Sequence, residues 1–546
     1  MRMKNKLLFL LFTFTITING QVPSIQFSKC IGSPQGNDFG SSILQTSDGG
    51  YILGCTTGYY QRNVVPNGEN GDLEGGNGNG FRIFKIGVSG NIIWQTYVNG
   101  NYNGSVGGAT SVLTSMVATN DGSYIVMGTT NATLWGSSNI EGSLYYSTTT
   151  DKICLAKISS SGTILWQKMC LPNNYNFYNN IIKKTNDGGY IITGRISYSG
   201  SEDYYLIKLD SNANFVWYQF YGTFNYDNAS DVIQCPDGGY LINGTASAPQ
   251  YGAYHPLVAK GGRDILVIKT DSSGNYIWSK CYGGTGQDTG AKLLNTSDGG
   301  FLITGTTNSN NLDVSNNHGG NDNWIIKTNS IGDIQWQKTY GGTRDDSIVD
   351  IIKSSDGNYV FSSTIISNDG DITFNNGNNK TDSWVVKINQ TGTILWQKSF
   401  GGSQSDEISS IIQSSDNGYA LTGSTNSSDG DIIGYHNPGY TNPPLDIMAI
   451  KISQDNLSTN IFKKDEILIY PNPANDHITI DCGTLANVSG WNIKITNILG
   501  QEVFSQPIIM KQYILPIKTW GGSGMYFVQI INSQGQIVDI KKIVLQ

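Results

Sequence analysis

The stretch TSDGGFLITG, residues 296–305, decides the fold, because close copies of it recur along the chain. Each copy places an Asp-Gly or Asp-Asn turn between short runs of β-branched and aromatic residues, which is the pattern of a tight β-hairpin. The turn Asp is expected to hydrogen-bond its own backbone, and a catalytic role for every copy is implausible. The copies begin at Thr46, Thr119, Thr185, Cys235, Thr296, Ser354 and Ser414.

A second hairpin follows the first in each repeat. It is clearest in DSWVVKINQTGTILWQKSFGG, residues 382–402. Trp384, Val386 and Ile388 fall on one face of the first strand and Val385 and Lys387 on the other, the period of two that half-buried strands show. The repeats are about 60 residues long, which leaves room for four strands and their loops. No apolar period of 3.6 residues interrupts them.

Seven repeats of four antiparallel strands predict a β-propeller rather than a sandwich or a solenoid. The fourth strand, marked by a Trp, occurs in six repeats, and the seventh repeat ends at Ile452 without one. The segment IQFSKCIG, residues 25–32, resembles the missing strand. The sequence therefore predicts an all-β chain in which residues 21–452 form a seven-bladed propeller of four-stranded blades, closed by pairing of residues 25–30 with residues 446–452.

The N-terminus and the composition predict an exported protein. Lys4 and Lys6 precede a short apolar run that ends near Gly20, so residues 1–20 are interpreted as a cleaved signal peptide, and no transmembrane segment is expected. A net charge of -8 without acidic or basic blocks argues against a nucleic-acid partner. The seven Cys show no metal-site spacing, and no disulfides are assigned. A monomer is expected.

The repeats resemble the bacterial β-propeller repeat family abbreviated SBBP. Its units read roughly as D-x-W/F-V-x-K-L-x-x-x-G, Y-x-G-G-x-x-x-D and D-x-x-G-x-Y-V-x-G. The resemblance covers residues 25–452. It implies the fold and leaves the activity open, because propellers host many functions.

A different module follows a linker at residues 453–466. Residues 467–546 carry YPNP at 470–473, IKITNILGQEVF at 493–504, and GMYFV at 524–528 followed by KKIV at 541–544. These motifs, in this order, resemble the type A sorting domain of the type IX secretion system of Bacteroidetes. Short alternating strands between Gly, Asn and Pro turns predict a small β-sandwich. The resemblance implies that the secretion machinery is a partner, and that the protein is secreted or attached to the outer cell surface.

Long connections between the second and third strands are predicted to build the binding face. They leave the end of the propeller opposite the tight turns, and loops on a rigid scaffold commonly carry function. Their aromatic side chains can stack on sugar rings or pack on a protein partner, or they can simply fix the loops in place. The ligand-binding candidates are Tyr59, Tyr60, Trp135, Tyr145, Tyr146, Tyr251 and Tyr254.

Acidic residues form the second candidate set. SNDGDI at residues 367–372 and SSDGDI at residues 427–432 recur at equivalent places, and closely spaced oxygens suit Ca²⁺. Neither copy completes a twelve-residue calcium loop, and Asp-Gly pairs are also common turn formers. The metal candidates are Asp313, Asp369, Asp371, Asp429 and Asp431.

Two function classes follow from these patterns. The four His are isolated, and no HExxH or GxSxG motif occurs. The sequence therefore favours a non-enzymatic binding or adhesion propeller whose ligand, a glycan or a protein, it does not identify. The alternative is a carbohydrate-active or other extracellular hydrolase with paired carboxylates on the long-loop face. The inter-blade residues Asp38, Asp227, Asp288, Asp346 and Asp406 are interpreted as structural, although a glycosidase site among them is left open.

Overall fold

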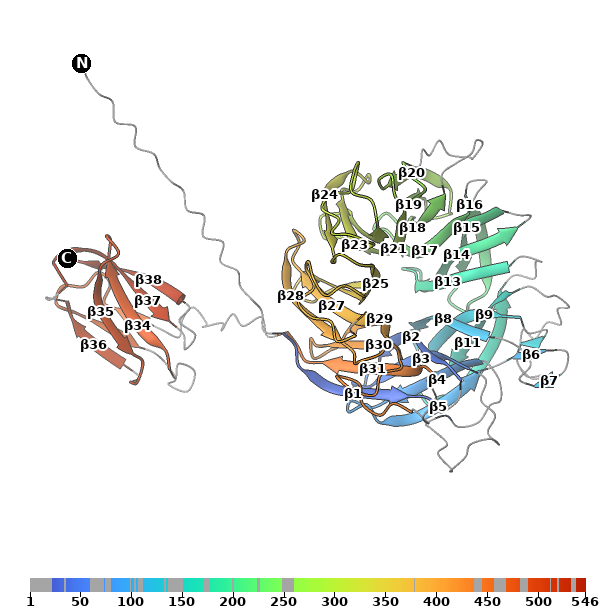
Figure 1. Ribbon diagram of the computed structural model, residues 1–546, viewed down its shortest axis with the longest axis horizontal. Coiled ribbons are helices and arrows are strands. Elements are labelled where there is room, and N and C mark those ends of the chain that lie inside the picture. Colours follow the sequence, from blue (N-terminus) through green and yellow to red (C-terminus); the bar gives the residue numbers. More distant parts are fainter. Residues whose placement is uncertain are drawn as a thin grey trace, which may run out of the picture. The chain divides into compact units, whose positions relative to one another are not determined.

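The computed structural model describes residues 22–546 apart from 34–35, 59–72, 74–79, 99, 103–104, 107–110, 132–133, 136–150, 171–175, 199–200, 223–225, 248–259, 378, 437–443, 456–467, 482–489, 511, 518–519 and 532–536. The regular elements of these residues are β-strands (Figure 1). Within them, no helix is long and apolar enough to cross a membrane. The chain divides into two compact units, whose longest segments are Val22–Asp455 and Asn456–Gln546.

Seven four-stranded antiparallel sheets form the blades of the first unit. Blade 1 contains β2 (Asp38–Gln45), β3 (Tyr51–Thr57), β4 (Gly80–Ile86) and β5 (Ile92–Val98). Blade 2 contains β8 (Ser111–Ala118), β9 (Tyr124–Thr130), β11 (Lys152–Ile158) and β12 (Ile164–Cys170). Blade 3 contains β13 (Asn176–Lys184), β14 (Tyr190–Tyr198), β15 (Ser201–Leu209) and β16 (Phe215–Tyr221). Blade 4 contains β17 (Asp227–Gln234), β18 (Tyr240–Ser247), β19 (Arg263–Thr270) and β20 (Tyr276–Tyr282).

The remaining blades repeat this order. Blade 5 contains β21 (Asp288–Asn295), β22 (Phe301–Thr307), β23 (Asp322–Thr328) and β24 (Ile334–Tyr340). Blade 6 contains β25 (Asp346–Lys353), β26 (Tyr359–Ile365), β27 (Asp382–Ile388) and β28 (Ile394–Phe400). Blade 7 contains β29 (Asp406–Gln413), β30 (Tyr419–Thr425), β31 (Asp446–Ile452) and β1 (Ile25–Ile31). A small extra sheet contains β6 (Gly100–Tyr102), β7 (Ser105–Val106) and β10 (Leu134–Trp135).

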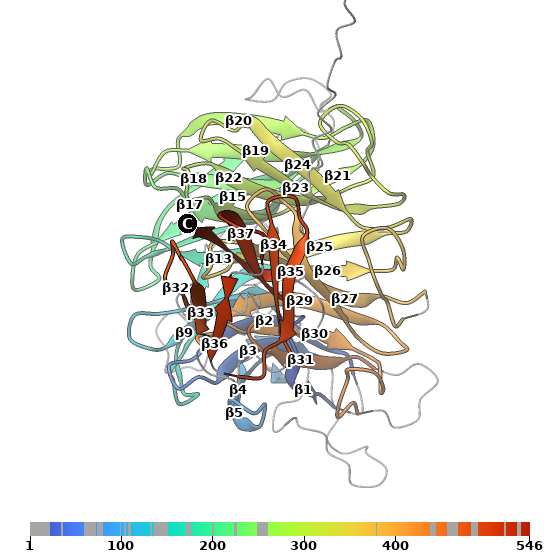
Figure 2. The same ribbon diagram turned by 90° about the vertical axis from the view of Figure 1, so that its left-hand side faces the viewer.

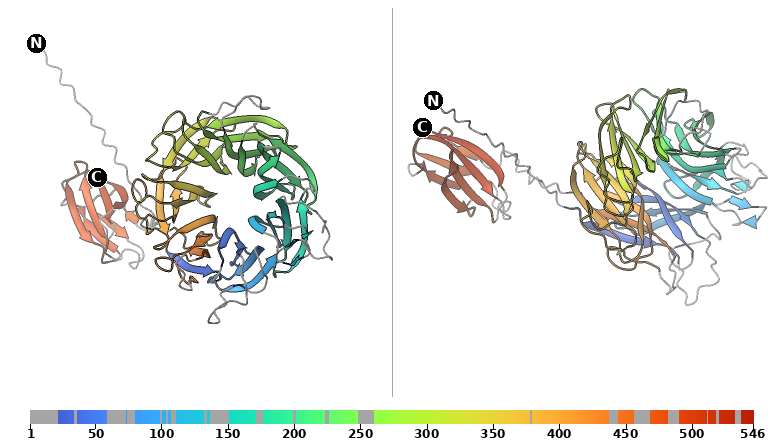
Figure 3. Two further views of the ribbon diagram at one scale, coloured as in Figure 1. Left: turned by 45° about the vertical axis from the view of Figure 1, so that its right-hand side comes forward. Right: turned by 45° about the horizontal axis from the view of Figure 1, so that its top comes forward.

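The closure of the ring is confirmed by the pairing of β1 with β31. Cys30 lies opposite Met448 and Ile31 opposite Ile447 in an antiparallel register. Figure 3 shows the result, in which the orange seventh blade lies next to the blue first blade. The seventh repeat thus takes its outer strand from the start of the chain, which links the two ends of the ring. The prediction of a seven-bladed propeller is confirmed.

The hydrophobic core of the propeller lies between the blades. Alternate residues of each strand point to opposite faces, so each sheet contributes apolar side chains to two interfaces. Seven buried clusters result, each joining two neighbouring blades, and one of them joins blade 7 to blade 1 through Ala420, Ile447 and Phe84. The ring is therefore held together around its whole circumference.

Each tight hairpin turn is tied to the third strand of its own blade. The turn Asp accepts a hydrogen bond from the backbone two residues on, as Asp48 Oδ1 does from Gly50 N at 3.2 Å. Its carboxylate also pairs with a lysine whose side chain is largely buried, a contact not expected from the turn pattern alone. The pairs are Lys85–Asp48, Lys157–Asp121, Lys208–Asp187, Lys269–Asp237, Lys327–Asp298, Lys387–Asp356 and Lys451–Asp416. Because the Asp end is solvated, each pair contributes at most about 1 kcal/mol.

The second unit is a β-sandwich, as predicted. One sheet contains β32 (Leu468–Tyr470), β33 (His477–Asp481) and β36 (Gln512–Pro516). The other contains β34 (Asn492–Asn497), β35 (Glu502–Pro507), β37 (Gly524–Ile531) and β38 (Ile537–Leu545) (Figure 2). Ile478 and Ile480 from the first sheet and Ile493, Val528 and Ile543 from the second share one buried cluster. This unit therefore has a core of its own.

Candidate functional site

The two ends of the propeller differ in the length of their connections. The hairpin turns between the first two strands and between the last two strands of a blade meet at one end, which we call the turn end. The connections between the second and third strands, and those between blades, leave the opposite end, called the loop end here. Since short turns leave few side chains free to converge, the loop end is the face on which a binding site can be built.

The predicted aromatic residues fall mostly outside the described part of the chain. Tyr59, Tyr60, Tyr145, Tyr146, Tyr251 and Tyr254 lie outside the described residues. Trp135 belongs to β10, which pairs with β6, but its side chain is likewise not described. The aromatic ligand site stays a prediction.

Two adjoining hollows lie at the loop end over blades 3 to 6. The first has a volume of 320 Å³ and is lined by Arg195, Glu202, Tyr226, Asn228, Ser230, Thr245, Arg263, Thr289 and Gly290. The second, of 510 Å³, is lined by Arg263, Gln287, Thr289, Gly290, Ala291, Thr306, Asn308, Asn321, Ser347 and Ile348. Because they share Arg263, Thr289 and Gly290, we treat them as one feature, the polar basin.

The arginines of the polar basin have different environments. The Arg195 guanidinium donates to Glu202 Oε2 at 2.6 Å and lies 4.6 Å from the centre of the Tyr178 ring, so it is fixed on two sides. Arg263, at the start of β19, is exposed, and its guanidinium has no carboxylate partner among the described residues. An unpaired guanidinium presents its planar set of donors to a ligand. Arg263 is therefore the strongest candidate for an anion contact.

Amide and hydroxyl groups surround Arg263. Asn308 accepts a hydrogen bond from Gln287 N at 2.6 Å through Oδ1, which directs its amide. Asn321 donates from Nδ2 to Asp345 Oδ1 at 2.9 Å. The side chain of Gln287 and the hydroxyl of Ser347 are exposed. Among its described residues, the basin thus combines the Arg263 guanidinium with neutral donors and acceptors and exposes the ring of Tyr226, 63% accessible.

The predicted metal-binding carboxylates hydrogen-bond the glycine-rich links between blades. Asp313 and Asp371 accept from Gly283 N at 3.2 Å and Gly341 N at 3.3 Å, and Asp369 accepts from Thr343 N at 2.8 Å. Asp429 accepts in the same way from Ser403 N at 2.7 Å. Within the described ranges, no group of three or more His, Cys, Asp or Glu side chains is placed to hold a metal ion.

Asp431 is tied to the same link through its backbone. Its N–H donates to Gly401 O at 3.0 Å, and burial raises the pKa of its carboxyl. The observed hydrogen bonds of these five Asp residues hold their loops against the links between blades. The calcium site is not tested by them and stays a prediction.

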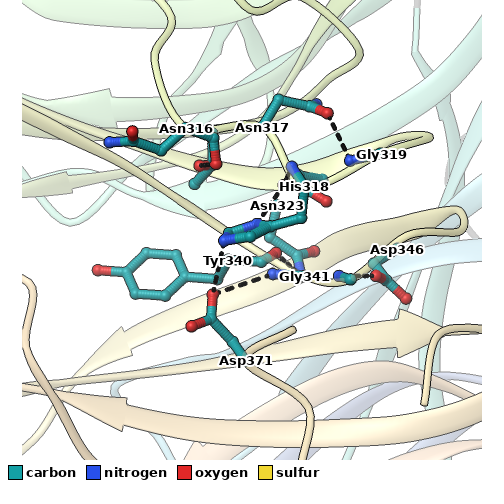
Figure 4. A network of polar contacts seen from close by, with 12 residues as sticks. Asn316, Asn317, His318, Gly319, Asn323, Tyr340, Gly341, Asp346 and Asp371 are labelled. Carbon is teal, nitrogen blue, oxygen red and sulfur yellow. Dashed lines mark hydrogen bonds and ion pairs between the residues drawn. The ribbon is translucent and has the colours of Figure 1, made fainter. Parts of the chain in front are cut away.

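A buried pair of carboxylates recurs where one blade meets the next. The Asp at the start of the third strand faces the Asp at the start of the next blade, with a Gly between them, as with Asp322, Gly341 and Asp346. A Cβ at Gly341 would clash with Asp322 Oδ1, so this position needs glycine. Asp346 accepts from Gly342 N at 2.9 Å, while His318 holds Asp322 Oδ2 (2.8 Å) and lies 3.8 Å from Asp371 (Figure 4).

These inter-blade carboxylates are inaccessible to a substrate. Asp38, Asp288, Asp346 and Asp406 have no exposed surface, and backbone N–H groups or hydroxyls occupy their oxygens. Burial raises the pKa of Asp38 to about 7. Asp382 pairs with Asp406. Burial and the charge of Asp406 raise the pKa of Asp382 to about 7. Their geometry is that of structural residues, which agrees with the sequence interpretation.

The raised pKa of Asp382 gives the stability of the ring a defined pH dependence. The folded carboxyl holds its proton up to about pH 7, whereas the unfolded one loses it near pH 3.8, so stability falls as pH rises between these values. We expect Asp382→Asn to remove this loss. The free energy of unfolding of the variant, relative to the unsubstituted protein, should therefore rise by up to a few kcal/mol between about pH 4.5 and pH 7.5. Thermal unfolding of both proteins across this pH range measures the difference.

Asp298→Asn is the matched control. Its carboxylate, bonded to Lys327, has a pKa of about 2, so both folded and unfolded forms are ionised across this window and the cost of the substitution should not change with pH. Equal pH profiles for Asp382→Asn and the unsubstituted protein would contradict the assignment of a protonated buried carboxyl.

Comparison with known proteins identifies the second unit. Residues 468–546 match the family described as "Secretion system C-terminal sorting domain". Among curated proteins, the regulatory protein FlaEY of Caulobacter vibrioides is 24% identical over 197 residues, which cover 34% of this chain. The chain spans only 19% of the length of that relative.

The chain also matches solved structures, at low sequence identity. PorZ of the type IX secretion system of Porphyromonas gingivalis is 11% identical, with a TM-score of 0.33 over 93% of this chain and 70% of its own. An ulvan lyase of polysaccharide lyase family PL25 is 10% identical, with a TM-score of 0.41 over 72% of this chain and 93% of its own. The seven blades rest on the strand pairing itself. Residues 468–546 are a secretion-system sorting domain, which marks this β-propeller protein for export to the extracellular space or the outer cell surface.

Proposed function

We propose that the exported propeller is a binding or adhesion module whose ligand occupies the polar basin. The observation that carries the proposal is the Arg263 guanidinium, which has no carboxylate partner among the described residues, is exposed where two hollows meet and is surrounded by amides and hydroxyls. A guanidinium with neutral hydrogen-bonding groups around it suits a carboxylate or sulfate flanked by hydroxyls. An acidic glycan has this chemistry.

The position of the basin supports the same proposal. The connections that carry the predicted aromatic residues start and end on strands whose tips lie at the loop end, as Thr57 of β3 and Gly80 of β4 do. Arg263 itself follows the connection that contains Tyr251 and Tyr254. Stacking residues next to a set of polar groups would give a glycan both faces and edges to contact.

A hydrolytic function has weaker support among the described residues. Glycoside hydrolysis needs two carboxyl groups on opposite sides of the scissile bond. Glu202 is the one carboxylate that lines the described basin, and Arg195 holds it in an ion pair. The buried inter-blade Asp residues offer no second group, since they have no exposed surface. Binding without turnover is therefore the proposed activity.

The test is an array of neutral, uronate-containing and sulfated oligosaccharides, probed with the purified chain and with Arg263→Gln. We expect binding to acidic members and about tenfold or greater weakening in the variant, because a hydrogen bond to a charged group is lost. Arg344→Gln, which removes an exposed arginine outside the basin, should bind normally. Absence of binding to every acidic member, or equal binding by Arg263→Gln, would overturn the proposal.

A further inference from the structure

The outer strand of blade 3 differs from the outer strands of the other blades. In β16, Tyr218 and Phe220 stand where β24 of blade 5 has Gln337 and Thr339. Phe215 begins the strand. Phe215 is 51% exposed, Tyr218 40% and Phe220 38%. We call them the aromatic row.

Among the described residues, the connection between the second and third strands of blade 3 does not cover the aromatic row. In blade 5, the connection between the second and third strands lies against the outer strand, where Thr339 Oγ1 donates to Asn316 O at 2.6 Å. In blade 6, Gln397 Nε2 donates to Asp371 O at 2.7 Å in the same way. In blade 3, β14 and β15 instead continue into one hairpin in which Tyr198 pairs with Ser201. Large rings replace the residues that bind the loop elsewhere.

The rings form a continuous surface beside a groove. The Phe215 and Tyr218 centroids are 6.0 Å apart, and Tyr218 and Phe220 stack at 4.9 Å with an interplanar angle of 29°. Phe215 also lines a hollow of 680 Å³ between blades 2 and 3, together with Trp166, Lys168, Asn212 and Asn214. Exposed aromatic rings next to amides offer apolar surface and hydrogen-bonding groups together, which is the chemistry that holds a polysaccharide chain.

The size of the aromatic row decides between possible occupants. At the exposures above, three rings that each bury about 150–250 Å² offer roughly 200–300 Å² in total. A stable protein interface needs about 800 Å² from each partner, so the row is too small to hold a protein by itself. The strand carries no charge, and the two lysines of the groove are engaged, Lys157 with the Asp121 carboxylate and Lys168 with Asn212 O and Asn214 Oδ1, which disfavours an ionic partner. We infer that the aromatic row and its groove bind a neutral polysaccharide, at a site distinct from the polar basin.

The experiment is affinity electrophoresis of the purified chain in gels that contain hydroxyethyl cellulose, xylan, laminarin or mannan. Retardation by at least one of them is expected. The triple variant F215I/Y218Q/F220T, which gives β16 the residues of β24, should weaken binding about tenfold to a hundredfold. Tyr276→Ile is the matched control, since Tyr276 begins the outer strand of blade 4 without the other two rings.

The outcomes separate this site from the polar basin. Arg263→Gln should be retarded like the unsubstituted chain, whether or not the basin binds acidic glycans. Should the triple variant fail to fold, the single variant Tyr218→Gln, which removes the middle ring, should still show several-fold weaker retardation. No retardation in any of the four gels, equal retardation of a folded triple variant, or a dimer in sedimentation that the triple variant abolishes would overturn the inference.

Discussion

A chain that ends at Asp455 is expected to fold as a propeller and to be absent from the cell surface. Residues 468–546 match a sorting domain and have their own buried core. The seven inter-blade clusters contain no residue beyond Ile452. Truncation therefore removes the export signal and leaves the ring intact. The measurement is surface labelling of the tagged chain in a host with type IX secretion, and delivery should fall to background.

The end point of this truncation matters. Asp455 Oδ2 accepts from Trp396 Nε1 at 3.0 Å and also contacts the Lys387 ammonium, so Asp455 belongs to the propeller. Arg263→Gln in the full chain is the control, because it leaves both cores unchanged and should reach the surface normally. Surface levels of the truncated chain equal to those of the full chain would show that export does not depend on the domain.

Ile31→Asp is expected to destabilise the ring by about 3–5 kcal/mol, because it places an unpaired charge in the buried cluster between blades 7 and 1. Ile31 has no exposed surface and lies opposite Ile447 on β31. Thermal unfolding checks this. Ile93→Asp is the matched control, since Ile93 lies on the outer strand β5 with 54% of its surface exposed and should tolerate the change.

The register of the closure has its own check. Met448→Cys places a second thiol opposite the native Cys30, at a spacing that antiparallel neighbours share with disulfides. Oxidation should join the two cysteines, and peptide mapping would detect the link. Equal stabilities of Ile31→Asp and Ile93→Asp, or no cross-link, would contradict a ring closed by β1.

The fold was largely predictable from the sequence because each repeat has the same turn residues and the same alternating pattern, and so predicts the same pair of hairpins. The seventh repeat has no fourth strand after Ile452, and residues 25–32 resemble the fourth strands of the other repeats. These two observations predicted the pairing that β1 and β31 show. The lysine partner of each turn Asp was missed. Its signal was present, since a Lys stands near the end of every third strand, as Lys327 and Lys387 do.

The candidate site was less predictable because its residues do not belong to the repeat. Arg195, Glu202 and Arg263 come from the ends of β14, β15 and β19, and only the ring brings them together. A sign in the sequence was Arg195, which stands where the other six repeats have Thr or Ser, as at Thr306 and Ser424. The SDGDI-type segments posed another problem, because a carboxylate that accepts backbone N–H groups and one that binds Ca²⁺ need the same residue types.

Binding without turnover at the polar basin is the central claim. Its most direct test uses an acidic oligosaccharide that the chain binds on the array, incubated with the purified chain. The bound fraction and the length of the recovered oligosaccharide are then measured in the same sample. Saturable binding of full-length ligand, weakened about tenfold in Arg263→Gln, is the predicted result. Shortened products that increase with time and protein concentration, or undiminished binding by Arg263→Gln, would contradict it.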